Sequence, residues 1–135
     1  MRAFREAVEA GDLGAVEALL AEDVVFTSPV VFKPYPGKAI TAAILRAVSQ
    51  VFEDFRYERE LAGGEGRDQA LVFSARVGDK RLTGCDFIHL NEEGLIDELT
   101  VMVRPLSGAQ ALAAAMGARF DEIVKEAEAR SASAP

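Results

Sequence analysis

The apolar residues of this chain change their spacing once, and that change restricts the fold more than any other feature. Up to residue 52 they mostly recur every three to four positions, as on one face of an α-helix. From residue 54 to residue 104 they recur every second position, as on a half-buried β-strand. Helices grouped before an antiparallel meander predict an α+β fold. We expect helices packed in a strongly curved, mainly antiparallel sheet, with a cone-shaped cavity between helices and sheet.

Turn and capping residues mark where the predicted elements begin and end. Asp12 can cap a helix by accepting a free backbone N–H, and Pro29 ends a short β-branched strand. Ser107 and Gln110 form a capping-box pattern before the last helix. The predicted helices cover residues 2–10, 13–22, 38–52 and 107–123. The predicted strands cover residues 23–28, 54–61, 70–77, 81–90 and 95–104, with a proline-rich loop over 31–37.

The length of 135 residues fits one domain, because a chain of this size can bury roughly two thirds of its unfolded surface. Half of the residues are apolar, which excludes a disordered chain. We expect a single domain over residues 1–130 and a flexible C-terminal tail over residues 131–135, since chain ends fray unless something holds them.

The charge balance limits the partners. The formal net charge is −7 and the pI is about 4.8, so the chain repels phosphate backbones and we expect no nucleic acid partner. We expect no membrane partner either, because no segment approaches the ~18 uninterrupted apolar residues of a membrane span. The N-terminus lacks a signal-peptide pattern, so a cytoplasmic protein is expected.

The heptad GCDFIHL, residues 84–90, holds the only cysteine and the only histidine of the chain. Cys85 and His89 lie on the same face of the predicted strand but about 13 Å apart along it, too far to share one metal ion. Asp86 points to the opposite face and away from both. The heptad is therefore not a cysteine–histidine site. We expect no metal and no cofactor.

Asp86 is the exception on its face of the strand. Its neighbours there, Gly84 and Ile88, are not polar, and an aspartate is both disfavoured in strands and costly to bury. An inward-facing Asp86 therefore has either hydrogen-bond partners or a chemical task. Both readings stay open at the level of sequence.

The order of the elements and three longer segments resemble the nuclear transport factor two-like superfamily. The segments are EAGDLGAVEALLAEDVVFTSPV, YPGKAITAAI and GCDFIHLNEEGLIDELTVMVRP. Within it, the SnoaL-like polyketide cyclase and ketosteroid isomerase group is the most similar. The resemblance covers roughly residues 2–120 and implies the curved, cone-shaped fold. It leaves the activity open, because this fold hosts isomerases, cyclases, hydrolases, dehydratases and binding proteins.

The steroid-isomerase pattern is only partly present. The position that the resemblance assigns to a general-base aspartate is Ser28, and the position of a helix tyrosine is Phe4. Asp86 matches a strand aspartate that the resemblance implies is a neutral, hydrogen-bonding acid. Because a serine alone is no base near pH 7, steroid isomerase activity is not expected.

Strand alternation and the resemblance together predict a mainly apolar pocket with a few polar groups, which is the usual composition of a small-molecule site. Asp86 is the predicted catalytic acid or base, while Ser28 and Tyr57 orient the ligand. Tyr35 is expected at the mouth. The predicted ligand-binding residues are Phe26, Ser28, Tyr35, Phe55, Tyr57, Phe73, Ile88, Leu99 and Val101, and Leu71 is expected to line the same pocket.

The opposite face of the sheet carries Phe87, His89 and Met102, and no predicted helix remains to cover it. Exposed apolar faces of this kind mark interfaces, and the resemblance implies sheet-to-sheet dimers, so we expect a homodimer. For function we expect a protein that binds a small apolar molecule, with isomerase- or cyclase-type acid–base catalysis by Asp86. The alternative is a non-catalytic binding or assembly module of the same fold.

Overall fold

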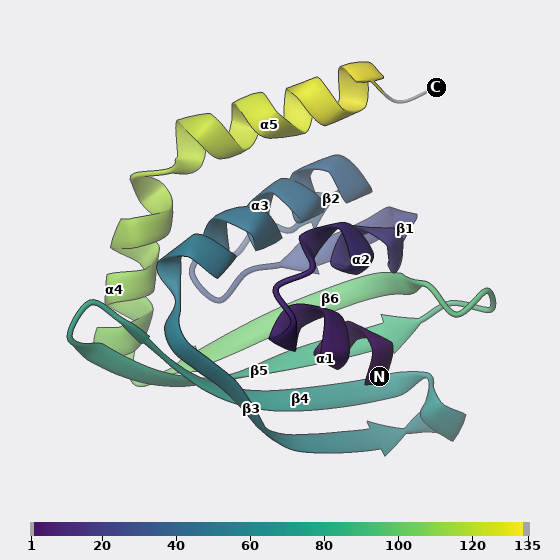
Figure 1. Ribbon diagram of the computed structural model, residues 1–135, viewed down its shortest axis with the longest axis horizontal. Helices are drawn as coiled ribbons and strands as arrows, with labels where there is room; N and C mark the ends of the chain where they lie inside the picture. The colour runs from purple at the N-terminus through teal and green to yellow at the C-terminus, as the bar shows by residue number, and fades with distance from the viewer. Residues whose placement is uncertain (1, 134–135) are drawn as a thin grey trace.

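One curved sheet organises the molecule, and the helices lie on its concave face (Figure 1). A computed structural model describes residues 2–133. The helices of this part are α1 (Arg2–Glu9), α2 (Leu13–Ala18), α3 (Lys38–Val51), α4 (Leu106–Gly117) and α5 (Phe120–Ser133), with one 3-10 turn, η1 (Gly64–Gly66). The strands are β1 (Leu20–Thr27), β2 (Tyr35–Pro36), β3 (Glu53–Gly63), β4 (Asp68–Val77), β5 (Lys80–Leu90) and β6 (Ile96–Arg104).

The sheet has the strand order β2-β1-β6-β5-β4-β3. Strands β3 to β6 form the predicted antiparallel meander, and the Gly78-Asp79 turn joins β4 to β5. Strand β1 pairs with β6 in parallel, so the sheet is mixed rather than purely antiparallel. The α+β prediction of a curved, mainly antiparallel sheet around helices is confirmed.

Three layers of helix close the concave side. Helices α1, α2 and α3 lie above the sheet, α4 stands at one end of it, and α5 runs along the outer side of α3 (Figure 1). In residues 2–133 no helix is both long and apolar enough to cross a membrane.

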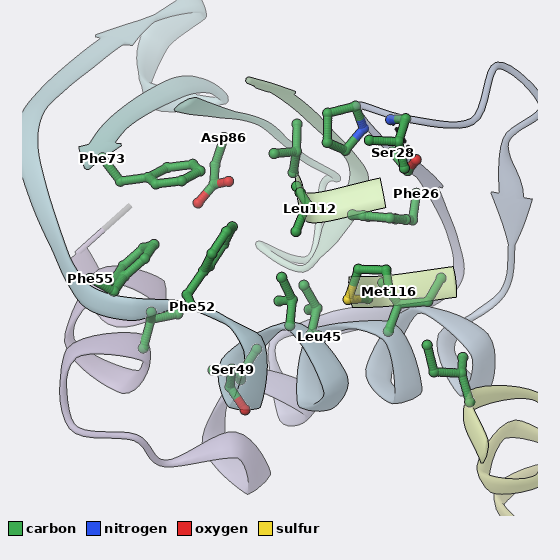
Figure 2. Close-up of a pocket in the computed structure, with 18 of the residues that line it drawn as sticks. Phe26, Ser28, Leu45, Ser49, Phe52, Phe55, Phe73, Asp86, Leu112 and Met116 are labelled. Atoms are coloured by element: carbon green, nitrogen blue, oxygen red, sulfur yellow. Dashed lines mark hydrogen bonds between the residues drawn. The ribbon is translucent and has the colours of Figure 1, made fainter. Parts of the chain in front are cut away.

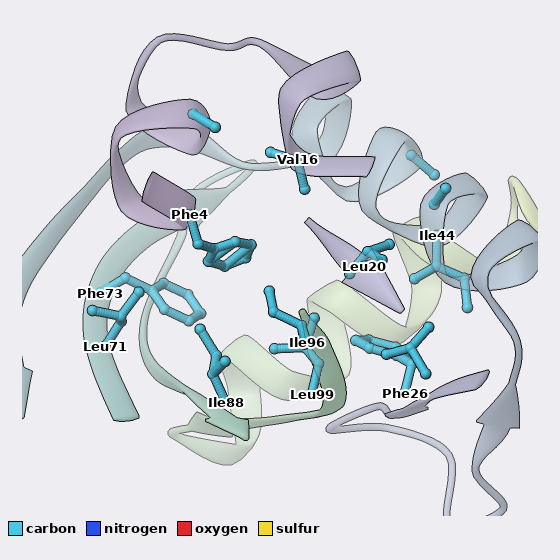
Figure 3. Packing of buried hydrophobic residues seen from close by; sticks show 14 of the residues in the cluster. Phe4, Val16, Leu20, Phe26, Ile44, Leu71, Phe73, Ile88, Ile96 and Leu99 are labelled. Carbon is cyan, nitrogen blue, oxygen red and sulfur yellow. The ribbon is translucent and has the colours of Figure 1, made fainter. Parts of the chain in front are cut away.

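The core lies between the sheet and α1 to α3, as the strand alternation requires (Figure 3). Val24 and Phe26 of β1 are buried while Val25 between them is exposed. The same alternation buries Leu71 and Phe73 of β4. Removing such apolar side chains from water contributes about 25 cal/mol for each Å² buried, the main favourable contribution to this fold.

A bulge in β3 changes which side chains of this strand face the core. Strand pairing shifts register between Tyr57 and Arg59, so Glu60 rather than Leu61 stands opposite the buried Leu71. A one-residue shift moves every following side chain to the other face. Leu61 is therefore 53% exposed, although alternation places it beside Tyr57, and Glu60 pairs with Arg5 of α1 at 3.5 Å.

Two predicted helices have different bounds. The second ends at Ala18 instead of Glu22, because Leu20 is 1% exposed and begins β1 beside Ile96 of β6. Burial of this segment in the sheet overrides its helical spacing. The last predicted helix is two helices, α4 against the sheet and α5 against α3, separated at residues 118–119.

The predicted tail is partly helical. Helix α5 continues to Ser133, so residues 131–133 belong to it, while residues 134–135 lie outside the described residues. Arg130 pairs with Glu17 and, at 3.1 Å, with Glu126. These ion pairs attach the end of α5 to α2, which explains why the helix does not fray at residue 130.

Candidate functional site

A cavity of about 480 Å³ lies between the concave face of the sheet and the helices, within the usual size range of small-molecule sites. Its wall is mainly apolar. The sheet contributes Phe26, Phe55, Tyr57, Phe73, Asp86 and Val101, and the loop after β1 contributes Ser28, Pro29, Val30 and Val31. The helices contribute residues that include Phe4, Ile44, Leu45, Val48, Leu112, Ala113, Met116 and Ile123.

Asp86 is the only carboxyl group among the described residues that line this cavity. It stands in the middle of β5, between Leu71 of β4 and Val101 of β6. The residue is 8% exposed, and its carboxyl group points into the cavity beside Phe73 (Figure 2). The Tyr57 hydroxyl donates a hydrogen bond to Asp86 Oδ2 at 3.1 Å.

Burial sets the protonation of this pair. It raises the pKa of Asp86 from an ordinary 3.8 to about 7, and the hydrogen bond from Tyr57 offsets only part of the effect. Burial and the neighbouring Asp86 charge raise the pKa of Tyr57, so its phenol stays neutral and remains a donor. Near neutral pH the carboxyl group therefore exists in both forms, which suits a general acid or base.

Aromatic rings form the wall around Asp86. The Phe55 ring lies 5.0 Å from both the Phe73 and Tyr57 rings, and Phe52 lies 5.6 Å from Phe73. Gly84 makes room for this cluster, because a Cβ at that position would stand 2.3 Å from Phe73 Cζ and 2.9 Å from the Met102 carbonyl oxygen. The rings keep water from the carboxyl group on this side.

Ser28 provides a second polar group at the end of β1. Its Oγ accepts hydrogen bonds from the backbone N–H groups of Val30 at 3.1 Å and Val31 at 2.9 Å. A hydroxyl whose oxygen accepts twice still has its own proton to donate. Ser28 can therefore donate a hydrogen bond to a ligand but does not replace a carboxylate base.

The structure brings most of the predicted site residues together. Asp86, Phe26, Ser28, Tyr35, Phe55, Tyr57, Phe73 and Val101 line the cavity. The Tyr35 ring lies 6.4 Å from that of Phe26.

Three residues predicted to line the pocket do not. Ile88, Leu99 and Leu71 face the same side of the sheet, but they pack in the core near Phe4 and Ile96 (Figure 3). Each is 3% exposed or less. Alternation decides which face a side chain is on, whereas the helices decide which part of that face stays open.

The helical part of the wall was missed. Leu45, Val48 and Phe52 from α3 and its end, with Leu112 and Met116 from α4, line the cavity (Figure 2). Their helical spacing gives a signal for an apolar stripe, and all five lie in segments predicted to be helical. That signal does not distinguish a stripe packed on a sheet from one facing a cavity.

The prediction for the heptad holds. The β4–β5 ladder runs without a register shift from Asp68 to Val77, so Asp86 faces inward while Cys85 and His89 face outward. Burial, and then the Asp86 charge, raise the pKa of the Cys85 thiol, which makes it less reactive.

Comparison with known proteins agrees with this geometry. The SnoaL-like domain family matches residues 1–99. A steroid delta-isomerase from Pseudomonas aeruginosa is 43% identical, with 90% of this chain and 89% of that chain covered and a TM-score of 0.85. An uncharacterised protein with a cystatin-like fold from Silicibacter pomeroyi is 41% identical, with 94% and 91% covered and the same TM-score of 0.85.

More distant structures share only the fold. An NTF2-like protein from Cytophaga hutchinsonii is 20% identical, with 77% of this chain and 86% of that chain covered and a TM-score of 0.61. No curated protein matches the chain. Since the family match spans most of the sequence and includes both Tyr57 and Asp86, this chain belongs to the SnoaL-like domain family.

Proposed function

We propose that the protein is an acid–base enzyme of the isomerase or cyclase type, which moves a proton on an apolar, ring-containing carbonyl compound. One observation carries the proposal: Asp86, a buried carboxyl group with a pKa of about 7, lines a cavity whose wall is otherwise mainly apolar. A group that is half-protonated near neutral pH can both accept and return a proton.

In this proposal Asp86 takes a proton from a carbon next to the substrate carbonyl. The electron pair of the broken C–H bond forms an enolate. Asp86 then returns the proton to another carbon of the conjugated system, which moves a double bond. Alternatively, the enolate carbon attacks a second carbonyl carbon and closes a ring, and the alkoxide formed from that carbonyl takes the proton from Asp86. The Ser28 hydroxyl orients the substrate by donating a hydrogen bond, Tyr57 holds the Asp86 carboxyl group in place, and the rings of Phe55 and Phe73 contact the apolar body of the substrate.

Similarity to the steroid delta-isomerase supports the isomerase class, since the two chains are 43% identical over 90% of this one. Two departures from the steroid-isomerase pattern argue for a different substrate or proton path. Ser28 stands where a carboxylate base is expected, and Phe4 stands where a hydroxyl donor is expected. Tyr57 instead supplies the phenol that is bonded to Asp86.

A second candidate function is binding without catalysis. It is favoured by the cavity wall, where no described residue adds a second carboxyl group to Asp86. In this reading the carboxyl group and Tyr57 only fix the orientation of a bound molecule.

Deuterium exchange distinguishes the two candidates. Polycyclic ketones, unsaturated cyclic ketones and phenols are first screened by thermal shift, and the binders are incubated with the protein in D₂O near pH 7. NMR then follows deuterium entering next to the carbonyl group. We expect exchange with the native protein and about 10²- to 10⁴-fold slower exchange with Asp86→Asn.

Phe87→Ala, on the outer face, is the matched control and should exchange at the native rate. If ketones bind but none of them exchanges deuterium, the result would support binding without catalysis. If none of these compounds binds, both candidates fail.

We also propose a homodimer that pairs the outer sheet faces. Phe87 is 43% exposed and Met102 is 58% exposed on adjacent strands, with His89 at the end of the same face. Light scattering at micromolar concentration tests this assembly, and Met102→Lys should give monomers. A monomeric native protein would exclude it.

A further inference from the structure

The outer face of the sheet holds a cluster of potential metal ligands at the end of β5 and β6. His89 Nδ1 lies 2.6 Å from Asp97 Oδ1 and 3.8 Å from Glu98 Oε2. The three ligand atoms lie within 4.8 Å of one another. Strand alternation alone would place Asp97 and Glu98 on opposite faces, so this arrangement needs an explanation.

A bulge in β6 explains why Asp97 and Glu98 both reach His89. His89 pairs with Glu98, whereas the next residue, Leu90, pairs with Ile96, so Asp97 is an extra residue in its strand. A bulge of this kind re-aims one side chain without ending the sheet. Both carboxyl groups therefore reach the same imidazole from a rigid pair of strands. Asp68, opposite His89 on β4, adds further negative charge nearby.

The spacing fits a small divalent ion. Bonds of 2.0–2.2 Å in a tetrahedral site hold neighbouring ligand atoms about 3.3 Å apart. The two separations from His89 Nδ1, 2.6 Å to Asp97 Oδ1 and 3.8 Å to Glu98 Oε2, lie on either side of that value. One imidazole with two carboxylates suits borderline ions such as Zn²⁺ better than Ca²⁺ or Mg²⁺, which prefer oxygen ligands alone.

We propose that His89, Asp97 and Glu98 bind one Zn²⁺-like divalent ion on the outer face of the sheet, with water completing its coordination. The expectation that the chain has no metal site rested on Cys85 and His89, which are too far apart along β5. The ligands that complete the site come from β6 instead. The site lies on the opposite face from Asp86, so it is independent of the proposed reaction.

Calorimetric titration of the full chain with ZnCl₂, in a buffer without chelators, tests the site. We expect one ion per chain. His89→Ala and Asp97→Asn should each weaken binding at least about tenfold. A large excess of Mg²⁺ should not compete. Co²⁺ should bind with the same stoichiometry and show the visible absorption of a low-symmetry site, which His89→Ala should abolish.

Cys85→Ala is the matched control, because its thiol is another possible Zn²⁺ ligand on this face, and the variant should bind Zn²⁺ as the native protein does. Asp97→Asn tests the metal site independently of the proposed dimer, because it changes a proposed ligand and leaves Phe87 and Met102 in place. Native binding by His89→Ala, or no stoichiometric binding by the native chain, would mean that the cluster is only an ion pair.

Discussion

Two aspartates on adjacent strands, one on each face of the same sheet, show how burial decides the chemistry of a carboxyl group. Asp86 faces the concave side, where it is 8% exposed and has a neutral phenol as partner. Asp97 faces the outer side, where its side chain is 28% exposed and its partner is an imidazole. The residue type is the same, but Asp86 is buried beside apolar rings whereas Asp97 is partly exposed to water.

The difference has two causes. Desolvation raises the pKa of Asp86 to about 7, and the hydrogen bond from Tyr57 offsets only part of this effect. At Asp97 the side chain is partly exposed and contacts the imidazole, and this hydrogen bond raises the pKa of His89. The concave face thus holds a buried carboxyl group that titrates near neutral pH, and the outer face holds a carboxyl group in contact with an imidazole.

The largest expected effect is on the free energy of unfolding, and it compares two phenylalanines on neighbouring strands. Phe73 is 1% exposed on the concave face, and Phe87 is 43% exposed on the outer face. Phe73→Ala should lower the free energy of unfolding by about 3–5 kcal/mol, since it leaves a void beside the ring cluster. Phe87→Ala, measured by urea unfolding at low concentration, should cost less than about 1 kcal/mol. Equal losses would contradict the assignment of faces.

The second test follows the pH dependence of Asp86. Its folded-state pKa is raised, so the stability it contributes is fully present below about pH 4 and is lost as pH rises through about 7. Asp86→Asn removes this loss. The free energy of unfolding of the variant, relative to the native protein, should therefore increase by about 3 kcal/mol between about pH 4.5 and about pH 8. A constant difference across that range would show that Asp86 is not buried in its charged form.

The third test inserts one methyl group under the ring cluster. Gly84→Ala places its Cβ against Phe73 and the Met102 carbonyl, so it should cost about 1–3 kcal/mol of unfolding free energy. Gly117→Ala, in α4, is the matched change, because no atom lies within 4 Å of its Cβ. It should be neutral or slightly stabilising. A neutral Gly84→Ala would mean that the Phe73 ring is free to move.

A smaller effect is expected when the partner of Asp86 loses its hydroxyl. Tyr57→Phe removes the hydrogen bond that favours the carboxylate, so the pKa of Asp86 should rise above about 7. Carbon-13 NMR of the aspartate carboxyl groups measures the change. Tyr35→Phe, in the same cavity, should leave this titration unaltered.

The smallest effect concerns the outer face. Asp97→Asn removes the hydrogen-bond partner that raises the pKa of His89, so that pKa should fall. Proton NMR follows the only imidazole in the chain without assignment. Glu122→Gln, which removes a carboxyl group from α5, should not alter the titration of His89. An unchanged His89 titration in Asp97→Asn would show that the two side chains do not interact in solution.

Much of the sheet was predictable from local patterns. The alternation of β5 correctly placed Asp86 opposite Cys85 and His89, because neither neighbouring ladder shifts register between Cys85 and His89. Alternation along a strand fails where a ladder shifts register, at Leu61 and again at Asp97. A bulge is decided by the pairing of two strands, so the pattern within one strand does not reveal it.

The helices show the same limit. The spacing of Leu20 fits a helix, yet its place beside Ile96 of β6 puts it in the sheet. The apolar stripe with Leu112 and Met116 was visible, but its contact with a cavity depends on where α4 is held. Helical periodicity indicates which side of a helix is buried, but it does not indicate whether that side packs against a sheet or lines a cavity.

Sequence alone determined the fold class and the inward direction of Asp86, because both depend on the spacing of neighbouring residues along the chain. Only the tertiary structure decided that Tyr57, 29 positions away, bonds to Asp86, that Ile88 is core rather than cavity, and that Asp97 reaches His89. These outcomes depend on how separate elements pack against one another. The cavity between helices and sheet results from that packing, so it cannot be predicted from the sequence of any single segment.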